Sequence, residues 1–206
     1  GRHLQIDGSV YQVRWNDIQQ IVNLPECAIR FIGNLGQARS RGFDLQLSAT
    51  PFPGVSIDGS IGYNDTKYSI DARLAPGGDV VVNKGDAIEG PPWTLALGGQ
   101  YDFDALDRRF YIRGDVEYKS RLNTPTTDRD PLSANYDPAL IPPDANTFVS
   151  LRAGAKIGDA NVSIFVDNLF DSAPQLSYNH LDSDTLLFED STFRPRTVGL
   201  TVTYGR

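Results

Sequence analysis

Phe193-Arg-Pro-Arg-Thr-Val-Gly-Leu-Thr-Val-Thr-Tyr-Gly-Arg206 is the stretch of sequence that decides the fold. Successive side chains of an extended strand point to opposite faces, so one face carries Val198, Leu200, Val202 and Tyr204. The other face carries only threonine and glycine. Alternation that ends in an aromatic residue is typical of a membrane-barrel strand, whose outer face contacts lipid. We interpret this stretch as a bilayer-facing strand.

The same period of two recurs along most of the chain. Together with the last strand it predicts about eight antiparallel strands, most of them near the ~9–11 residues that a tilted strand needs to cross a bilayer. The first segment is less regular, because its apolar face begins at Leu4, Ile6 and Val10 and then moves to Tyr11, Val13 and Trp15. That change predicts a bulge or a large aromatic side chain that faces the interior. The regular segments are residues 43–49, 55–63, 93–103, 110–118, 149–157 and 162–167.

Short and long connections alternate between these segments. Tight turns are predicted at 51–54, 104–107 and 158–161, and the long polar loops are roughly 16–37, 69–91, 122–146 and 171–192. Outer-membrane barrels have short periplasmic turns and longer extracellular loops. A soluble β-sandwich also alternates, but it has shorter strands with a turn signal every ~8–12 residues. We therefore predict an all-β antiparallel transmembrane barrel, with interfacial aromatic residues at Trp93, Tyr101, Phe103, Phe110 and Tyr118.

Composition limits the class of protein. The 206 residues carry a formal net charge of −7, and mean hydropathy is −0.32. No apolar run reaches the ~18 residues of a transmembrane helix, whereas barrel strands score weakly on hydropathy. The acidic balance without a Lys/Arg cluster argues against a nucleic-acid partner. The chain contains no Met and no signal-peptide pattern, so we expect a mature product or a fragment.

Charged side chains alternate with the apolar ones on several strands and are the candidate lumen-facing residues. Because both signs are mixed, we favour a structural ion-pair network in the lumen over a selectivity path for a charged substrate. We find no catalytic motif and no cofactor site; Ser177 and His180 lack the strained nucleophile turn of a hydrolase. We expect no enzyme activity. The candidates are Arg113, Asp115, Glu117, Lys119 and Arg121 on one strand, and Arg152 and Lys156 on another; Asp44 and Asp58 add carboxylates on further strands.

Two further features leave alternatives open. Cys27 is the single cysteine; we favour an isolated loop thiol over a disulfide to a cysteine upstream of this sequence. The loop at 122–146 supplies carboxylates without the ligand spacing of an EF-hand, so calcium binding stays undecided. We interpret the loop at 171–192, which contains Tyr178, His180, Asp182 and Asp184, as a solvated binding loop.

Four segments, in the right order, resemble TonB-dependent outer-membrane receptors. Val166-Asp-Asn-Leu-Phe-Asp171, a long loop and then residues 193–200 are similar to the C-terminal end of these receptors. The other similar segments are Val10–Ile18, Asn34–Leu47 and Gly90-Pro-Pro-Trp-Thr-Leu95. The resemblance implies that residues 1–206 are the C-terminal part, about the last third, of a 22-stranded barrel. It also implies that the plug domain and the signal peptide are absent from this sequence.

The resemblance implies a function as well. Such a protein lies in the bacterial outer membrane, among its lipids, and takes up a scarce nutrient of the siderophore, cobalamin or glycan class. TonB, contacted through the missing N-terminal region, supplies the energy. The barrel-assembly machinery would read the last strand, with Val198, Leu200, Val202 and Tyr204. The alternative is a small self-contained outer-membrane barrel that acts as a structural subunit, anchor or adhesin. A first strand able to pair with residues 198–204 would support that alternative.

Overall fold

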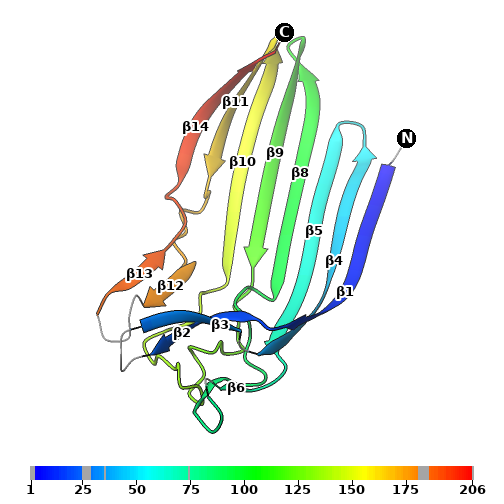
Figure 1. Ribbon diagram of the computed structural model, residues 1–206. Coiled ribbons are helices and arrows are strands. Elements are labelled where there is room, and N and C mark those ends of the chain that lie inside the picture. Colours follow the sequence, from blue (N-terminus) through cyan, green and yellow to red (C-terminus); the bar gives the residue numbers. More distant parts are fainter. Residues whose placement is uncertain (1–2, 25–28, 35, 74, 181–185, 206) are drawn as a thin grey trace.

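The fold is one curved antiparallel sheet of eight long strands (Figure 1). A computed structural model describes residues 3–24, 29–34, 36–73, 75–180 and 186–205. The predicted all-β antiparallel architecture with about eight strands is confirmed. In sheet order the strands are β1 (His3–Asn16), β4 (Gln37–Phe52), β5 (Val55–Tyr68), β8 (Trp93–Ala105), β9 (Arg108–Lys119), β10 (Asn146–Ile157), β11 (Ala160–Asp167) and β14 (Thr197–Tyr204).

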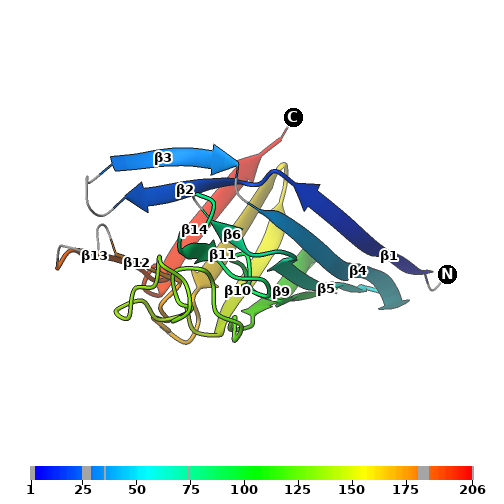
Figure 2. The same cartoon turned by 60° about the horizontal axis from the view of Figure 1, so that its bottom comes forward.

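Connections at the two ends of the sheet differ as predicted. At one end the turns are tight; between β8 and β9 both Leu106 and Asp107 have positive φ, as a two-residue hairpin that follows the strand twist requires. At the other end, which lies at the bottom of Figure 1, three of the long loops contain small hairpins of their own (Figure 2). These hairpins are β2 (Gln19–Leu24) with β3 (Ile29–Asn34), β6 (Ala72–Arg73) with β7 (Val80–Val82), and β12 (Ser177–His180) with β13 (Phe188–Ser191).

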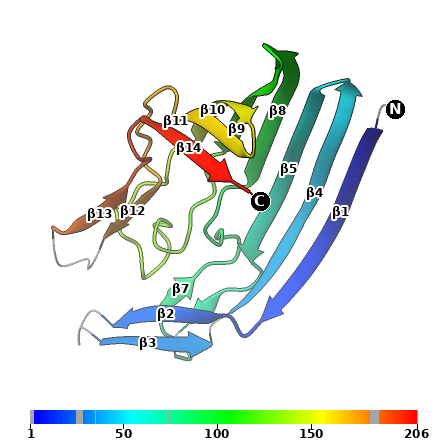
Figure 3. The same cartoon turned by 90° about the horizontal axis from the view of Figure 1, so that it is seen from above.

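The sheet is open. β1 pairs only with β4 and β14 only with β11 among the described residues, so the first and last long strands do not pair with each other. Seen from above in Figure 3, the strands follow a curved wall from β1 to β14. An open edge inside a membrane leaves backbone N–H and C=O groups without partners, which is costly in hydrocarbon. The eight strands therefore do not form a small closed barrel by themselves.

The two faces of the sheet differ in polarity. Cross-strand partners on one face are apolar, as where Leu97 lies opposite Val116 and Ile164 lies opposite Leu200. These side chains stay exposed although they are large; Val198 is 71% exposed and Leu200 65%. A continuous exposed apolar face of this kind is what a lipid-facing barrel wall presents. We call it the outer face, and the opposite, polar face the inner face.

Aromatic side chains form two clusters on the outer face. Near the loops, Phe43, Tyr63 and Trp93 pack together, and the Tyr63 and Trp93 ring centroids are 4.7 Å apart. Near the tight turns, Phe103 stacks between Tyr101 and Phe110. At ~3.3 Å per residue and a tilt of ~40°, the ten residues from Trp93 to Phe103 rise about 25 Å, the height of the apolar band of an outer-membrane barrel.

The irregular first segment has a simple cause. The register of β1 with β4 runs from His3 opposite Thr50 to Asn16 opposite Gln37 without a shift, so β1 has no bulge. Its odd residues stay on the inner face throughout. Tyr11 lies there against Gly42, where an added Cβ would be 2.4 Å from the Tyr11 hydroxyl oxygen. Of the two sequence-based alternatives, the inward-facing aromatic is therefore correct.

A buried apolar cluster lies at the loop end of the sheet. It consists of side chains that are at most 7% exposed: Ile18, Ala38, Tyr68, Ala72, Val81 and Val82. Residues from two connections and from the strand ends beside them thus pack into one cap. In the described part of the chain, no helix has the length and apolar character needed to cross a membrane.

Candidate functional site

The inner face encloses a hollow of about 540 Å³. Its wall comes from β1, β4, β5, β8 and β9, and polar or small side chains predominate because every second residue of each strand points inward. Charged and amide groups of the wall include Gln5, Asp7, Gln46, Asp58, Asp115 and Glu117. The concave side of the sheet is therefore its polar side, as the lumen of a barrel requires.

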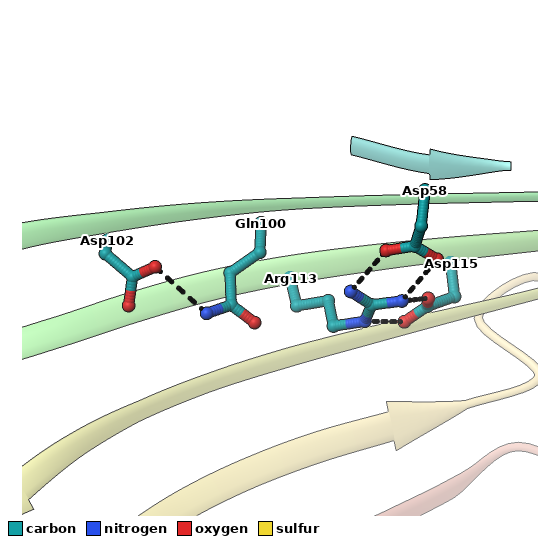
Figure 4. Close-up of polar contacts among 5 residues, drawn as sticks. All are labelled: Asp58, Gln100, Asp102, Arg113 and Asp115. Carbon is teal, nitrogen blue, oxygen red and sulfur yellow. Dashed lines mark hydrogen bonds and ion pairs between the residues drawn. The ribbon is translucent and has the colours of Figure 1, made fainter. Parts of the chain in front are cut away.

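Arg113 joins two strands across this inner face (Figure 4). Its Nη1 and Nη2 atoms donate to the two carboxylate oxygens of Asp58 at 3.0 and 3.1 Å. Its Nε donates to Asp115 Oδ2 at 3.0 Å and its Nη2 to Asp115 Oδ1 at 2.5 Å. A planar guanidinium suits such paired contacts with two carboxylates. The cluster lies directly over Gly98, the residue of β8 between Asp58 and Asp115.

A second polar contact lies farther toward the tight turns. Gln100 Nε2 donates to Asp102 Oδ2 at 3.1 Å, as Figure 4 also shows. The other oxygen of Asp102 is 3.8 Å from Arg109 Nε, and the Arg109 side chain is 68% exposed. Such exposed pairs contribute little stability.

The candidates on β10 do not extend the Arg113 cluster. Arg152 lies opposite Arg113 in the register, but its Nη1 donates to Ser163 Oγ at 3.1 Å and its guanidinium lies 5.1 Å from the centre of the Phe165 ring. This cation–π contact holds the second arginine on the β11 side. Lys156 lies beside the β10–β11 turn, exposed and opposite Asn161.

The remaining β9 candidates approach the loops. Glu117 is part of the wall of the hollow, and Lys119 is the last residue of β9. The prediction that Arg121 continues the same ladder is wrong, because the strand ends two residues earlier. Arg121 Nη1 lies 3.7 Å from Asp144 Oδ1, and its side chain borders a cavity that also contains Trp93 of the outer face. The seven candidates are thus spread over the whole height of the sheet.

A second cavity, of about 400 Å³, opens at the loop end. Its lining combines Lys119 from β9, Arg129 from the 122–146 loop and Phe193 before β14. The Arg129 side chain is only 10% exposed; its Nε donates to Thr126 Oγ1 at 2.7 Å and lies 3.8 Å from Asp128 Oδ1. We call this cavity the mouth pocket. Sequence reasoning missed Arg129, because nothing local marks a loop arginine for burial.

Several contacts fasten the loops to one another, and two of them involve ionisable side chains that are mostly buried. His180 Nδ1 lies 2.5 Å from Asp137 Oδ2, which joins β12 to the 122–146 loop. Both side chains are mostly buried, at 7% and 14% exposure, and the His180 ring stacks on Phe188 of β13 at 4.3 Å. The 171–192 loop is therefore anchored at His180 rather than solvated there. Asp182, Asp184 and Cys27 lie outside the described residues.

The second contact is a pair of buried carboxyl groups. Asn83 connects them: its backbone N–H donates to Asp86 Oδ2 and its Nδ2 donates to Asp130 Oδ2, each at 3.0 Å. Burial raises the pKa of Asp86 to about 6; the Asn83 N–H opposes this shift, and the neighbouring carboxyl of Asp130 adds to it.

Within the described residues, no group of three or more His, Cys, Asp or Glu side chains is arranged to hold a metal ion.

The last strand has the pairing that its sequence suggests. β14 pairs with β11 along its whole length, with Val198 opposite Val166 and Val202 opposite Val162. Leu200 and Tyr204 lie on the same outer face, so all four residues named for this strand face away from the hollow.

The family model described as "TonB dependent receptor-like, beta-barrel" matches residues 1–169. A comparison with curated proteins found no match.

Solved structures share the fold at low identity. The ferric yersiniabactin uptake receptor FyuA from Yersinia pestis is 16% identical, with a TM-score of 0.73 over 97% of this chain and 27% of that one. BauA, the ferric preacinetobactin receptor from Acinetobacter baumannii, is 17% identical, with a TM-score of 0.63 over 97% and 27%. The ferripyoverdine receptor of the Pseudomonas aeruginosa outer membrane is 16% identical, with a TM-score of 0.63 over 98% and 25%. The chain spans about a quarter of the length of these structures.

Proposed function

Because the chain belongs to the TonB-dependent receptor-like β-barrel family, a family of bacterial outer-membrane receptors, we propose that it is the C-terminal third of a barrel for nutrient uptake. In this proposal other strands complete the barrel at β1 and β14, and a plug domain fills the lumen. TonB supplies energy through a region outside these residues. The barrel-assembly machinery reads β14. The nutrient is of the siderophore, cobalamin or glycan class.

The observation that carries this proposal is the combination of a lipid-facing wall with a capped polar interior. An exposed apolar outer face spans about 25 Å between aromatic clusters. The inner face carries charged groups of both signs that are partly paired with one another, which suits contact with a plug or with water better than conduction of ions of one sign. The loop cap is packed and holds a pocket of about 400 Å³. A packed cap with a pocket at the loop end supports capture of a small molecule from outside.

The mouth pocket supports a ligand with several hydrogen-bonding groups. Lys119 and Arg129 supply cationic donors, Glu89 and Asp144 supply carboxylates, and Phe193 supplies an apolar surface. Phe193 is itself held in place by an edge-to-face contact with Phe148, at 5.0 Å between ring centroids. We therefore assign Lys119 and Arg129 to ligand contact, and the Arg113 cluster to the structure of the lumen wall.

Uptake by whole cells tests the function. Cells that make the natural-length receptor are given labelled ferric siderophores, cobalamin and oligosaccharides, with and without a functional TonB system. We expect one class to be accumulated only with TonB. The variant Lys119→Gln should weaken binding of that ligand, whereas Lys156→Gln, with the same charge change at the turn end, should not. Equal uptake without TonB, or no uptake of any class, would contradict the proposal.

A further inference from the structure

The outer face becomes basic just beyond the aromatic cluster at the loop end. Arg14, Arg39 and Lys67 lie directly opposite one another across β1, β4 and β5. We call these three residues the basic row. They share the strand face of Phe43 and Tyr63, because Arg39 is four positions from Phe43 on β4 and Lys67 is four positions from Tyr63 on β5. Arg41 lies on the same face, between the basic row and the aromatic cluster.

The charges of the basic row are only partly neutralised within the protein. Lys67 Nζ lies 2.8 Å from Asp65 Oδ1, and Arg41 Nε donates to Gln12 Oε1 at 2.7 Å. No carboxylate of the described residues lies within ion-pair distance of Arg14 or Arg39, and both are exposed. Like charges directly opposite each other on neighbouring strands destabilise a sheet. An external anion would remove this repulsion.

The position of the row relative to the membrane limits what that anion is. The row lies four residues beyond Phe43 on β4, or about 13 Å along the strand and about 10 Å in height at a tilt of ~40°. Arg41 lies half as far from Phe43 along β4. The headgroup layer extends about 5–7 Å beyond the hydrocarbon core, and long basic side chains bend toward the interface. The guanidinium groups therefore reach the level of lipid phosphates.

We propose that the basic row and Arg41 bind the phosphorylated headgroup of a glycolipid in the outer leaflet. A guanidinium binds phosphate oxygens in pairs, and basic clusters beside a membrane surface recognise anionic headgroups. The ligand is a lipid rather than free phosphate, because the row faces away from the hollow and continues the lipid-facing surface above the aromatic cluster. The inference uses the outer-membrane location alone, so it stands or fails independently of nutrient uptake.

Native mass spectrometry of the natural-length receptor in a neutral detergent tests this site. The probe is bisphosphorylated lipid A, compared with its dephosphorylated form and with inorganic phosphate. For the double variant Arg14→Gln/Arg39→Gln we expect roughly thirtyfold weaker binding of lipid A, about 2 kcal/mol at 1.4 kcal/mol per factor of ten, with each basic side chain contributing about half. The dephosphorylated lipid should bind wild type at least as weakly as lipid A binds this variant, because Lys67 and Arg41 still contact phosphate in the variant.

A matched control separates the site from overall charge. The double variant Arg108→Gln/Arg109→Gln removes the same two charges at the tight-turn end, and its affinity for lipid A should equal that of wild type. The double variant Arg14→Lys/Arg39→Lys keeps both charges, and its affinity for lipid A should stay within about threefold of wild type. This lysine variant replaces the glutamine variant if the latter does not fold. The proposal is overturned by unchanged binding in the glutamine variant, by an equal loss in the control, or by inorganic phosphate binding as tightly as lipid A.

Discussion

Gly98 gives the sharpest test of the inner-face network. A Cβ at this position would lie 2.4 Å from Arg113 Nη2, 2.6 Å from Asp58 Oδ2 and 2.8 Å from Asp115 Oδ1. All three distances are shorter than real Cβ contacts, so Gly98→Ala must displace the ion-pair cluster. The neighbouring Gly99 points to the other face, where a Cβ would meet nothing within 4 Å. Gly99→Ala is therefore a control on the same strand.

The size of the effect follows from what is displaced. The three atoms lie at the ends of side chains, so the backbone need not move, and the loss is that of one or two charged hydrogen bonds. Such bonds contribute ~1.5–3 kcal/mol each when buried. The Arg113 and Asp58 side chains are 29% and 55% exposed, and solvent reduces the contribution of exposed pairs to below ~1 kcal/mol. We expect Gly98→Ala to lower the free energy of unfolding by about 1–2 kcal/mol.

Urea unfolding of the refolded receptor in lipid vesicles measures this difference. Gly99→Ala should change the free energy of unfolding by less than about 1 kcal/mol, and toward greater stability, because alanine reduces the freedom of the unfolded chain. In an Arg113→Gln background the cost of Gly98→Ala should fall by at least half, since part of the cluster is already gone. Equal effects of Gly98→Ala and Gly99→Ala, or an undiminished cost in that background, would refute the reasoning.

Three further predictions concern other parts of the molecule. Leu97→Arg, near the middle of the outer face, should cost about 2–4 kcal/mol in the same unfolding assay if that face contacts lipid; a loss below ~1 kcal/mol would argue against a lipid-facing wall. The pKa of Asp86 is about 6 in the folded cap and 3.8 ordinarily, so the folded cap binds this proton more tightly than the unfolded chain does. The stability of the cap should therefore be greatest below about pH 4 and fall as the pH rises to about 6. Hydrogen-exchange protection of residues 69–91 should follow that curve in wild type and become flat in Asp86→Asn, and a wild-type cap better protected at pH 7 than at pH 5 would contradict the assignment. His180→Ala removes the contact with Asp137 and should speed proteolysis within residues 171–192 several-fold, whereas cleavage at the wild-type rate would show that this contact does not anchor the loop.

The strands could be predicted because their pattern is local. Alternation over Phe110–Tyr118 fixes which side of β9 is apolar, and the tight turns fix its neighbours. A one-residue slip would move the apolar side chains of a strand from the membrane-facing surface to the inner face, so the register has little freedom. The eight strands and their faces therefore followed from the sequence. β1 was harder to assign because Tyr11, Val13 and Trp15 are apolar yet face inward. That choice depends on Gly42 of the next strand, which makes room for the Tyr11 ring.

The functional loops could not be predicted in the same way. Their structure depends on contacts between distant segments, such as Asp137 with His180 and Asn83 with Asp130. No short-range pattern connects residues more than 40 positions apart. Arg121 was misplaced for a related reason: the alternation in sequence continues past Lys119, but the strand ends there. The inner-face candidates also looked like one ladder, whereas only Arg113 and Asp115 share direct contacts.

The most direct test of the receptor assignment is the intact mass of the polypeptide that contains these residues, measured after extraction from isolated outer membranes. We expect a mass several times the 22.6 kDa of this chain, because a plugged, energy-coupled receptor needs the remaining strands and the plug on the same polypeptide. A mass of 22.6 kDa would contradict it.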